Sequence, residues 1–168
     1  MFKAPYRPKL DLPKTTIEKI ADIIGISAFL LSLLYIVLNW FNLPAEVPVH
    51  FNGTGDVDRW GSKFQLLLLP AIGIVMFIMM HIIGKKPHIH NYPDRLNETN
   101  VEAFYTTSRK FLNVMKNLIN ILFAYLTYEI ILVAQEQAAS FSMFGMIVIM
   151  IAIVVVIAVA MIKMARIK

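Results

Sequence analysis

Cysteine is absent from the 168 residues, and only 16% of the residues are charged. Without cysteine, the chain has no disulfide framework, no thiolate nucleophile and no cysteine-ligated zinc site. With 58% hydrophobic residues, the composition excludes an ordinary water-soluble domain, which averages about 25% charged and about 45–50% apolar residues. It also excludes a disordered chain, because such chains have too few apolar residues to bury a core. The mean hydropathy of +0.64 instead predicts a small set of membrane helices.

Long apolar runs fill most of the sequence. A helix needs roughly 20 consecutive apolar residues to cross a bilayer. Four stretches meet this requirement, at residues 20–41, 64–83, 111–134 and 141–162. Thr15 and Glu18 are spaced as a capping box at the start of the first stretch. We therefore predict an all-α membrane protein, a four-transmembrane-helix bundle in a single domain over residues 1–168, with a short folded extracytoplasmic loop between the first two helices.

Basic residues gather at both chain ends and around the loop between the second and third spans. The leader alone carries Lys3, Arg7 and further lysines, whereas the other two loops together hold only Arg59 and Lys63. By the positive-inside rule, both termini are cytoplasmic, and loops 42–63 and 135–140 lie outside. The basic residues are better explained as topology signals than as a nucleic-acid surface, because no RNA- or DNA-binding motif accompanies them.

The first outer loop, LPAEVPVHFNGTGDVDRWGSK, carries the most information in the sequence. Residues 47–51 should be extended, because Pro48 disfavours helix in the residue before it, and Asn-Gly and Gly-Asp turn dipeptides follow. We expect a compact loop against the membrane, anchored by Phe51 and Trp60. Its candidate binding residues are His50, Asn52, Asp56, Asp58, Trp60 and Lys63.

The case for a metal in this loop is weak. Polar side chains alternate from residue 52 to residue 58 as in an EF-hand loop, but Val57 replaces the required glycine, and Lys63 stands where a bidentate glutamate is needed. His50 with Asp56 or Asp58 is a weak transition-metal candidate, since no further ligand pair defines the geometry. We favour turn capping and a hydrogen-bonded His50 over any single chemical role, and we expect no cofactor.

Two short motifs in the chain resemble a known family. The first is His50-Phe51-Asn52, followed by Gly55, Asp58 and Trp60-Gly61-Ser62-Lys63; the second is Asn91-Tyr92-Pro93, followed by Asn100 and Arg109. Over roughly residues 10–120, the chain resembles a domain of unknown function in bacterial membrane proteins, found at the start of SdpI-type immunity proteins. The resemblance implies a multi-pass protein of the bacterial cytoplasmic membrane that protects against, or senses, a secreted killing peptide. Longer SdpI-type members carry further spans and an extra C-terminal region.

Two helix faces carry packing signals. Gly25, Ala28 and Ser32 give the first span a small-residue face suited to close helix contact. Asn113, Asn117 and Asn120 recur at helical spacing in the third span, and Thr127 continues their face. We expect these polar side chains to face other helices, with a solute pathway as the alternative.

Glu129 is an acid inside the third span, near its outer end and on the opposite side of the helix from the asparagines. An acid inside a membrane span is costly and is by default a functional candidate. We expect its partner to come from the outer loop, from His50, Asp58 or Lys63.

The loop between the second and third spans holds two further candidate binding residues, Asn91 and Tyr92. His88 and His90 alternate there, and we expect surface histidines, because a third metal ligand is not apparent. Asp94 or Asn97 should cap a helix that runs into the third span.

Three functions fit these observations. The first is a membrane interaction protein that acts through loop 43–63 on a secreted peptide or a membrane-protein partner. The second is a small transporter, or a subunit of a transport complex, lined by the asparagines and Glu129. The third is a membrane enzyme with His50 as general base, oriented by Asp58 or Glu129. The expected partners are the lipid bilayer and the peptide or protein ligand, and a homo-oligomer is allowed.

Overall fold

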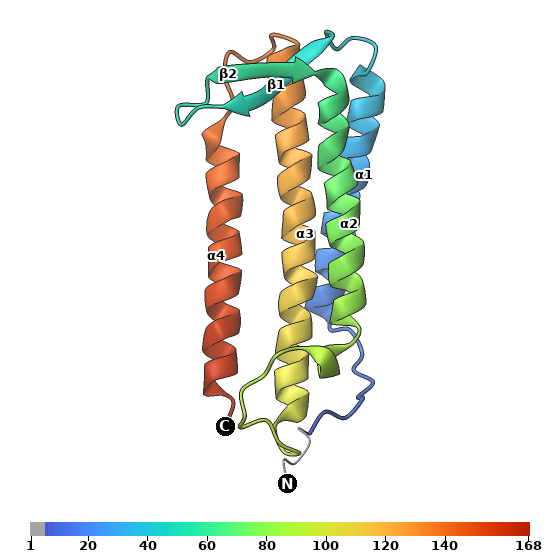
Figure 1. Cartoon of the computed structure of the whole chain (residues 1–168), viewed down its shortest axis with the longest axis vertical. Coiled ribbons are helices and arrows are strands. Elements are labelled where there is room, and N and C mark those ends of the chain that lie inside the picture. The colour runs from blue at the N-terminus through green and yellow to red at the C-terminus, as the bar shows by residue number, and fades with distance from the viewer. Residues whose placement is uncertain (1–5) are drawn as a thin grey trace.

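Four long helices run along the long axis of the molecule, with a β-hairpin across one end (Figure 1). The computed structural model describes residues 6–168, so Lys3 lies outside the described residues. The helices are α1 (Thr16–Asn39), α2 (Leu68–Gly84), α3 (Val101–Ala134) and α4 (Met143–Arg166), and the strands are β1 (Glu46–Phe51) and β2 (Val57–Ser62). Two 3₁₀ turns, η1 (Lys63–Leu67) and η2 (Pro87–Ile89), flank α2. All four helices are long and apolar enough to cross a membrane, with η1 extending the second span.

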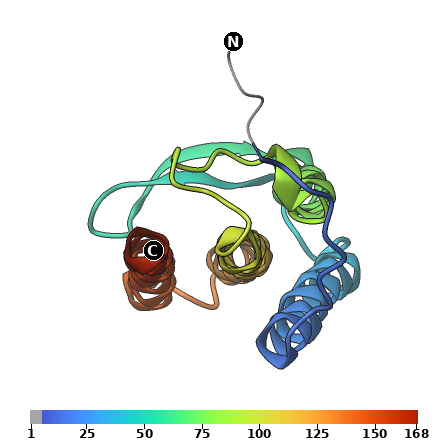
Figure 2. The same cartoon turned by 90° about the horizontal axis from the view of Figure 1, so that it is seen from below.

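Helix α3 is the centre of the arrangement. It contacts α1, α2 and α4, whereas within residues 6–168 those three helices barely touch one another. Viewed along the helices, α4 lies on one side of α3, and α1 and α2 lie on the other (Figure 2). The predicted four-helix bundle is therefore an open one, in which α4 packs only along α3.

Helix α3 begins ten residues before the span predicted from residue 111. Its 34 residues extend about 51 Å, well beyond the roughly 30 Å hydrocarbon core of a bilayer. The helix starts after Asn100, whose side-chain oxygen accepts a hydrogen bond from the backbone amide of Asn97 at 2.9 Å. The expected cap at Asp94 or Asn97 is thus displaced, because Asn97 instead forms a turn with Thr99 before the helix begins.

The predicted extracytoplasmic loop is a two-stranded antiparallel hairpin, so the all-α prediction omits two strands. Residues 47–51 are extended, as the sequence predicts, and lie within β1. Val47 is 1% exposed and packs with Ile36, Leu66 and Ile131. Strand β2 escapes detection because its sequence, VDRWGS, is mostly exposed and lacks a buried alternating face.

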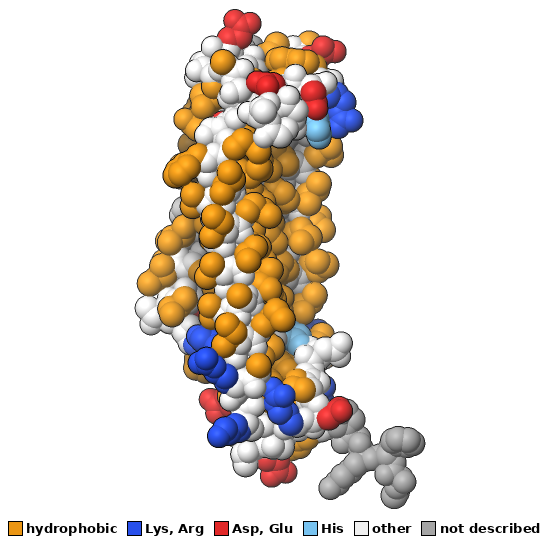
Figure 3. All heavy atoms as spheres, turned by 90° about the vertical axis from the view of Figure 1, so that its left-hand side faces the viewer, with side chains coloured by type: hydrophobic (Ala, Val, Ile, Leu, Met, Phe, Trp, Pro, Cys, Tyr) orange, Lys and Arg blue, Asp and Glu red, His pale blue; other side chains and the backbone are white. Residues whose placement is uncertain are grey.

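The outer surface has an apolar middle and charged ends. Figure 3 shows hydrophobic side chains over the length of the helices, acidic side chains together with basic and histidine side chains at the hairpin end, and lysines and arginines mixed with a few acids at the other end. We call these two regions the hairpin end and the basic end. Helix α4 buries none of its residues within the described structure, as expected of a helix that faces lipid.

Candidate functional site

The hairpin brings His50 and Asp58 together. The imidazole Nδ1 lies 2.6 Å from a carboxylate oxygen of Asp58, and both side chains are exposed. An ionised carboxylate only accepts hydrogen bonds, so Nδ1 is the donor in this pair. This pairing suits both a hydrogen-bonded loop histidine and an oriented base. Within residues 6–168, no three His, Asp or Glu side chains are arranged to hold a metal ion.

The turn between the strands is held by side chains that the sequence identifies as candidate ligands. The Asn52 side-chain oxygen accepts hydrogen bonds from the backbone amides of Thr54 and Asp56, each at 2.9 Å. Hydrogen bonds from the Thr54 hydroxyl and the Asn52 amide lower the pKa of the Asp56 carboxyl below its usual range. The turn therefore keeps a charged carboxylate exposed at its tip.

Lys63 and Trp60 serve different purposes at the other end of the hairpin. The Lys63 ammonium donates to the carbonyl of Trp40 at 3.1 Å and lies 5.1 Å from the centre of the Trp40 ring. It therefore ties the start of η1 to the end of α1. Trp60 remains 49% exposed, so its ring is accessible at the surface of the hairpin. Phe51 anchors the hairpin by packing against Phe141, and the two ring centres are 4.9 Å apart.

Glu129 is buried, at 6% exposure, and it points toward the start of α4. Its carboxylate accepts a hydrogen bond from the backbone amide of Ser142 at 2.9 Å. The expected partners from the outer loop are engaged elsewhere, since His50 pairs with Asp58 and Lys63 with the end of α1. Glu129 thus stabilises the first turn of α4, where the helix dipole favours negative charge.

A groove of about 550 Å³ lies beneath the hairpin, between β2 and α2. Arg59, Trp60 and Gln65 line it on the hairpin side, and Leu69 and Ile72 on the membrane side. The groove is therefore amphipathic. Exposed carboxylates of Glu46, Asp56, Asp58 and Glu136 surround this end of the molecule, against the basic side chains of Arg59 and Lys63.

A second polar assembly, which sequence reasoning missed, lies between α1 and α3 toward the basic end. Asp22 of α1 accepts hydrogen bonds from the Asn113 and Asn117 amides at 2.9 and 2.8 Å. It also pairs with Lys116 at 2.9 Å and with Lys14 at 2.6 Å. The asparagine face predicted to pack between helices is confirmed, but its partner is a carboxylate. Both Asp22 and Lys116 lie within the predicted spans, and a search for acids and bases inside every span would have found them.

Glu18 and Arg109 form a buried pair one turn nearer the end of the helices. The guanidinium donates to both carboxylate oxygens of Glu18, at 2.9 and 3.0 Å, and to the carbonyls of Leu12 and Pro13. Glu18 also accepts from the backbone amide of Thr15 at 2.8 Å, so the predicted capping box is confirmed. The carboxylate therefore serves both the helix cap and the contact between α1 and α3.

The inner loop folds back onto the start of α3. Tyr92 lies against Phe104 and Tyr105, and the Arg7 guanidinium lies 5.0 Å from the centre of its ring. Burial raises the pKa of Tyr92 to about 12. The imidazole of His90, expected at the surface, is hydrogen-bonded to the Ser108 hydroxyl and the Ile83 carbonyl.

Of the two predicted inner-loop ligands, Asn91 is exposed, whereas Tyr92 is half-buried in this aromatic cluster. The inner and outer candidates lie at opposite ends of the helices, so they do not form one site (Figure 1).

The four spanning helices define a multi-pass membrane protein, and the comparisons place the hairpin within a known domain. Residues 28–74 match DUF1648, a domain of unknown function. This match confirms the resemblance to a domain-of-unknown-function family, and it runs from the middle of α1 through the hairpin into α2.

An uncharacterized protein of Archaeoglobus fulgidus is 36% identical over 95 residues, which are 55% of this chain and 50% of that protein. The chain thus spans about half the length of that relative. No solved structure matches the chain.

Proposed function

We propose that this chain is a membrane binding protein whose hairpin end captures cationic, membrane-active peptides, in the manner of SdpI-type immunity or sensing proteins. The observation that carries the proposal is an amphipathic groove of about 550 Å³ beneath a hairpin that exposes the carboxylates of Glu46, Asp56 and Asp58. In this proposal the membrane topology of the protein follows its charge distribution, with the basic end cytoplasmic and the hairpin outside.

The chemistry of the hairpin end suits such a peptide. Exposed carboxylates attract a cationic chain and speed its encounter with the protein. Trp60 and the leucines of the groove then offer apolar contact for the other face of an amphipathic peptide. Only binding is required of His50 and Asp58, whose hydrogen bond links side chains of the two strands.

The test compares two pairs of neutralised acids. In nanodiscs, binding of a synthetic amphipathic Lys/Leu peptide to Asp56→Asn/Asp58→Asn should weaken by up to about fivefold per carboxylate, with a smaller dependence on salt. The matched control is Asp94→Asn/Glu98→Gln, which removes two exposed acids at the opposite end. Expressed at equal levels in a sensitive host, Asp56→Asn/Asp58→Asn should lose protection against secreted killing peptides, and Asp94→Asn/Glu98→Gln should keep it. Equal binding by wild type and both variants would refute the proposal.

A second candidate, transport, is favoured by the charges buried within the spans. Asp22 and Lys116 lie among the asparagines, with His81 3.5 Å from the Lys116 ammonium, and such groups often mark ion or proton paths. In proteoliposomes, Asp22→Asn should then abolish a proton or cation flux that Asp11→Asn, an exposed acid at the same end, leaves intact. Absence of flux in the wild type would leave the buried charges a purely structural role.

A further inference from the structure

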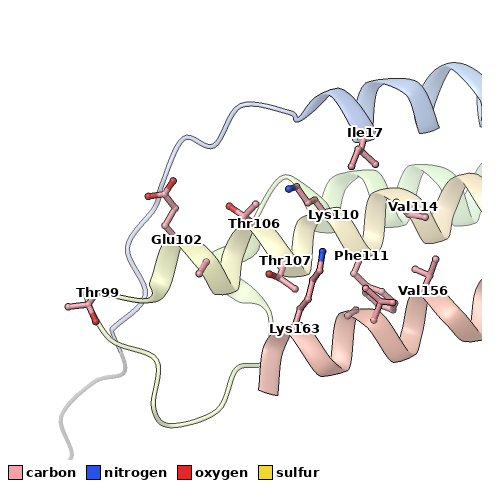
Figure 4. A pocket seen from close by; sticks show the side chains of 13 residues that line it. Ile17, Thr99, Glu102, Thr106, Thr107, Lys110, Phe111, Val114, Val156 and Lys163 are labelled. Carbon is pink, nitrogen blue, oxygen red and sulfur yellow. The ribbon is translucent and has the colours of Figure 1, made fainter. Parts of the chain in front are cut away.

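A groove of about 600 Å³ lies at the basic end, at the opposite end of the molecule from the hairpin. Figure 4 shows its walls, with Thr106 and Lys110 on α3 and Val156 and Lys163 on α4. Within residues 6–168, α3 is the helix along which α4 packs, and Ile17 of α1 also lines the groove. The groove is therefore open toward the lipid around the helices.

The side chains along the groove change from polar to apolar in the same direction on both helices. On α3, Thr107 and Lys110 lie nearer the end of the molecule, and Val114 lies deeper. On α4, which runs the opposite way, Lys163 lies near the end and Val156 deeper. A lipid with its headgroup at the bilayer surface and its chains inside presents the same order of chemistry.

Two positive charges stand where the groove changes from polar to apolar. Within residues 6–168, neither the Lys110 nor the Lys163 ammonium forms a salt bridge. Glu102 also lines the groove, but it lies about 12 Å along α3 from Lys110, toward the water. The charge available to a headgroup at the level of the lysines is therefore positive.

The walls of the groove are held in place at their open end. The Arg95 guanidinium donates to the carbonyls of Met164 and Ile167 at 2.7 and 3.1 Å, and the Asn100 amide donates to the carbonyl of Lys168 at 3.0 Å. These bonds fasten the last turn of α4 to the loop before α3. The backbone that carries Lys110 and Lys163 is therefore held in place, although no salt bridge among the described residues holds their side chains.

We propose that this groove binds an anionic phospholipid of the cytoplasmic leaflet. The phosphate lies between Lys110 and Lys163, near the hydroxyls of Thr106 and Thr107. An acyl chain follows the apolar wall made by Phe111, Val114 and Val156. The bound lipid fills the groove between α3 and α4 and stabilises the contact between these two helices. This site does not depend on what the hairpin binds.

Native mass spectrometry of the purified full chain tests this site. The protein is equilibrated with equal amounts of phosphatidylglycerol and phosphatidylcholine that carry the same acyl chains. The wild type should retain phosphatidylglycerol preferentially, and Lys110→Gln/Lys163→Gln should lower this retention by about fivefold for each lysine. Lys9→Gln/Lys168→Gln is the matched control, because it removes the same charge from exposed positions outside the groove.

Three outcomes would overturn the proposal. They are an absence of preference for phosphatidylglycerol, an equal loss in both double variants, and displacement of the lipid by millimolar inorganic phosphate. If the first double variant fails to fold, Ala160→Phe fills the apolar part of the groove without changing charge. That variant should lose retention of phosphatidylglycerol while keeping the wild-type circular dichroism spectrum.

Discussion

Each end of the molecule has an acid–base pair that joins two elements, and the two pairs differ in their access to water. In the Glu18–Arg109 pair the side chains are 1% and 10% exposed, whereas in the His50–Asp58 pair they are 57% and 45% exposed. Removing one partner of a buried pair strands a charge, whereas an exposed pair contributes little to stability. The basic end therefore uses charge to hold helices together, whereas the charges of the hairpin end are exposed to solvent.

The difference extends to the backbone. At the basic end, Arg109 also bonds the carbonyls of Leu12 and Pro13, so the segment before α1 depends on it. At the hairpin end, backbone hydrogen bonds and the aromatic contact between Phe51 and Phe141 hold the strands in place. Substitutions of exposed hairpin charges can thus change binding while leaving the fold intact.

Arg109→Ala should have the largest effect of the substitutions considered. It leaves Glu18 buried without its cation and removes two bonds to the segment before α1, so we expect a loss of about 3–5 kcal/mol in the free energy of unfolding. Unfolding in detergent, followed by far-ultraviolet circular dichroism, measures this loss. Asp58→Ala is the comparison at the hairpin end, with an expected loss of at most about 1 kcal/mol. Equal losses in the two variants would remove the distinction drawn between the ends.

A smaller effect should come from a close contact between α1 and α3 at Gly25. A β-carbon at Gly25 would overlap the side chain of Asn117, whereas a β-carbon at Gly53 in the hairpin turn would meet nothing within 4 Å. Gly25→Ala should therefore cost about 1–3 kcal/mol through overpacking, although alanine is the better helix former. Gly53→Ala should leave the unfolding transition nearly unchanged. A neutral Gly25→Ala would show that Asn117 moves aside easily.

The sequence predicts this contact only in part. Gly25 and Ser32, with Ala28 between them, form the expected small-residue face, and the first two are buried. The spacing of the asparagines on α3 likewise predicts a face turned toward other helices. Neither pattern shows that the two faces meet, because that depends on how the helices are arranged in three dimensions.

The buried charges show why the site could not be read completely from the sequence. Glu18 is recognisable as a capping residue from its spacing to Thr15, which is a local signal. Its second role, as the ion-pair partner of a residue on α3, has no local signal. Its partner Arg109 lies 91 residues away. In the hairpin, by contrast, His50 and Asp58 are only eight residues apart, and the turn dipeptides between them already place them on facing segments. Local signals thus identified the exposed site and left the buried one to the structure.

Alkaline titration should lower the stability of the protein through Tyr92 at the basic end. Burial against α3 raises the pKa of Tyr92 to about 12, from about 10 in an unfolded chain. Between these values the unfolded state has released the phenolic proton and the folded state has not, so stability falls as the pH rises from about 10 to about 12. Melting temperatures from circular dichroism should fall more steeply over this range in wild type than in Tyr92→Phe. Parallel curves for the two proteins would contradict a contribution of Tyr92 to this loss of stability.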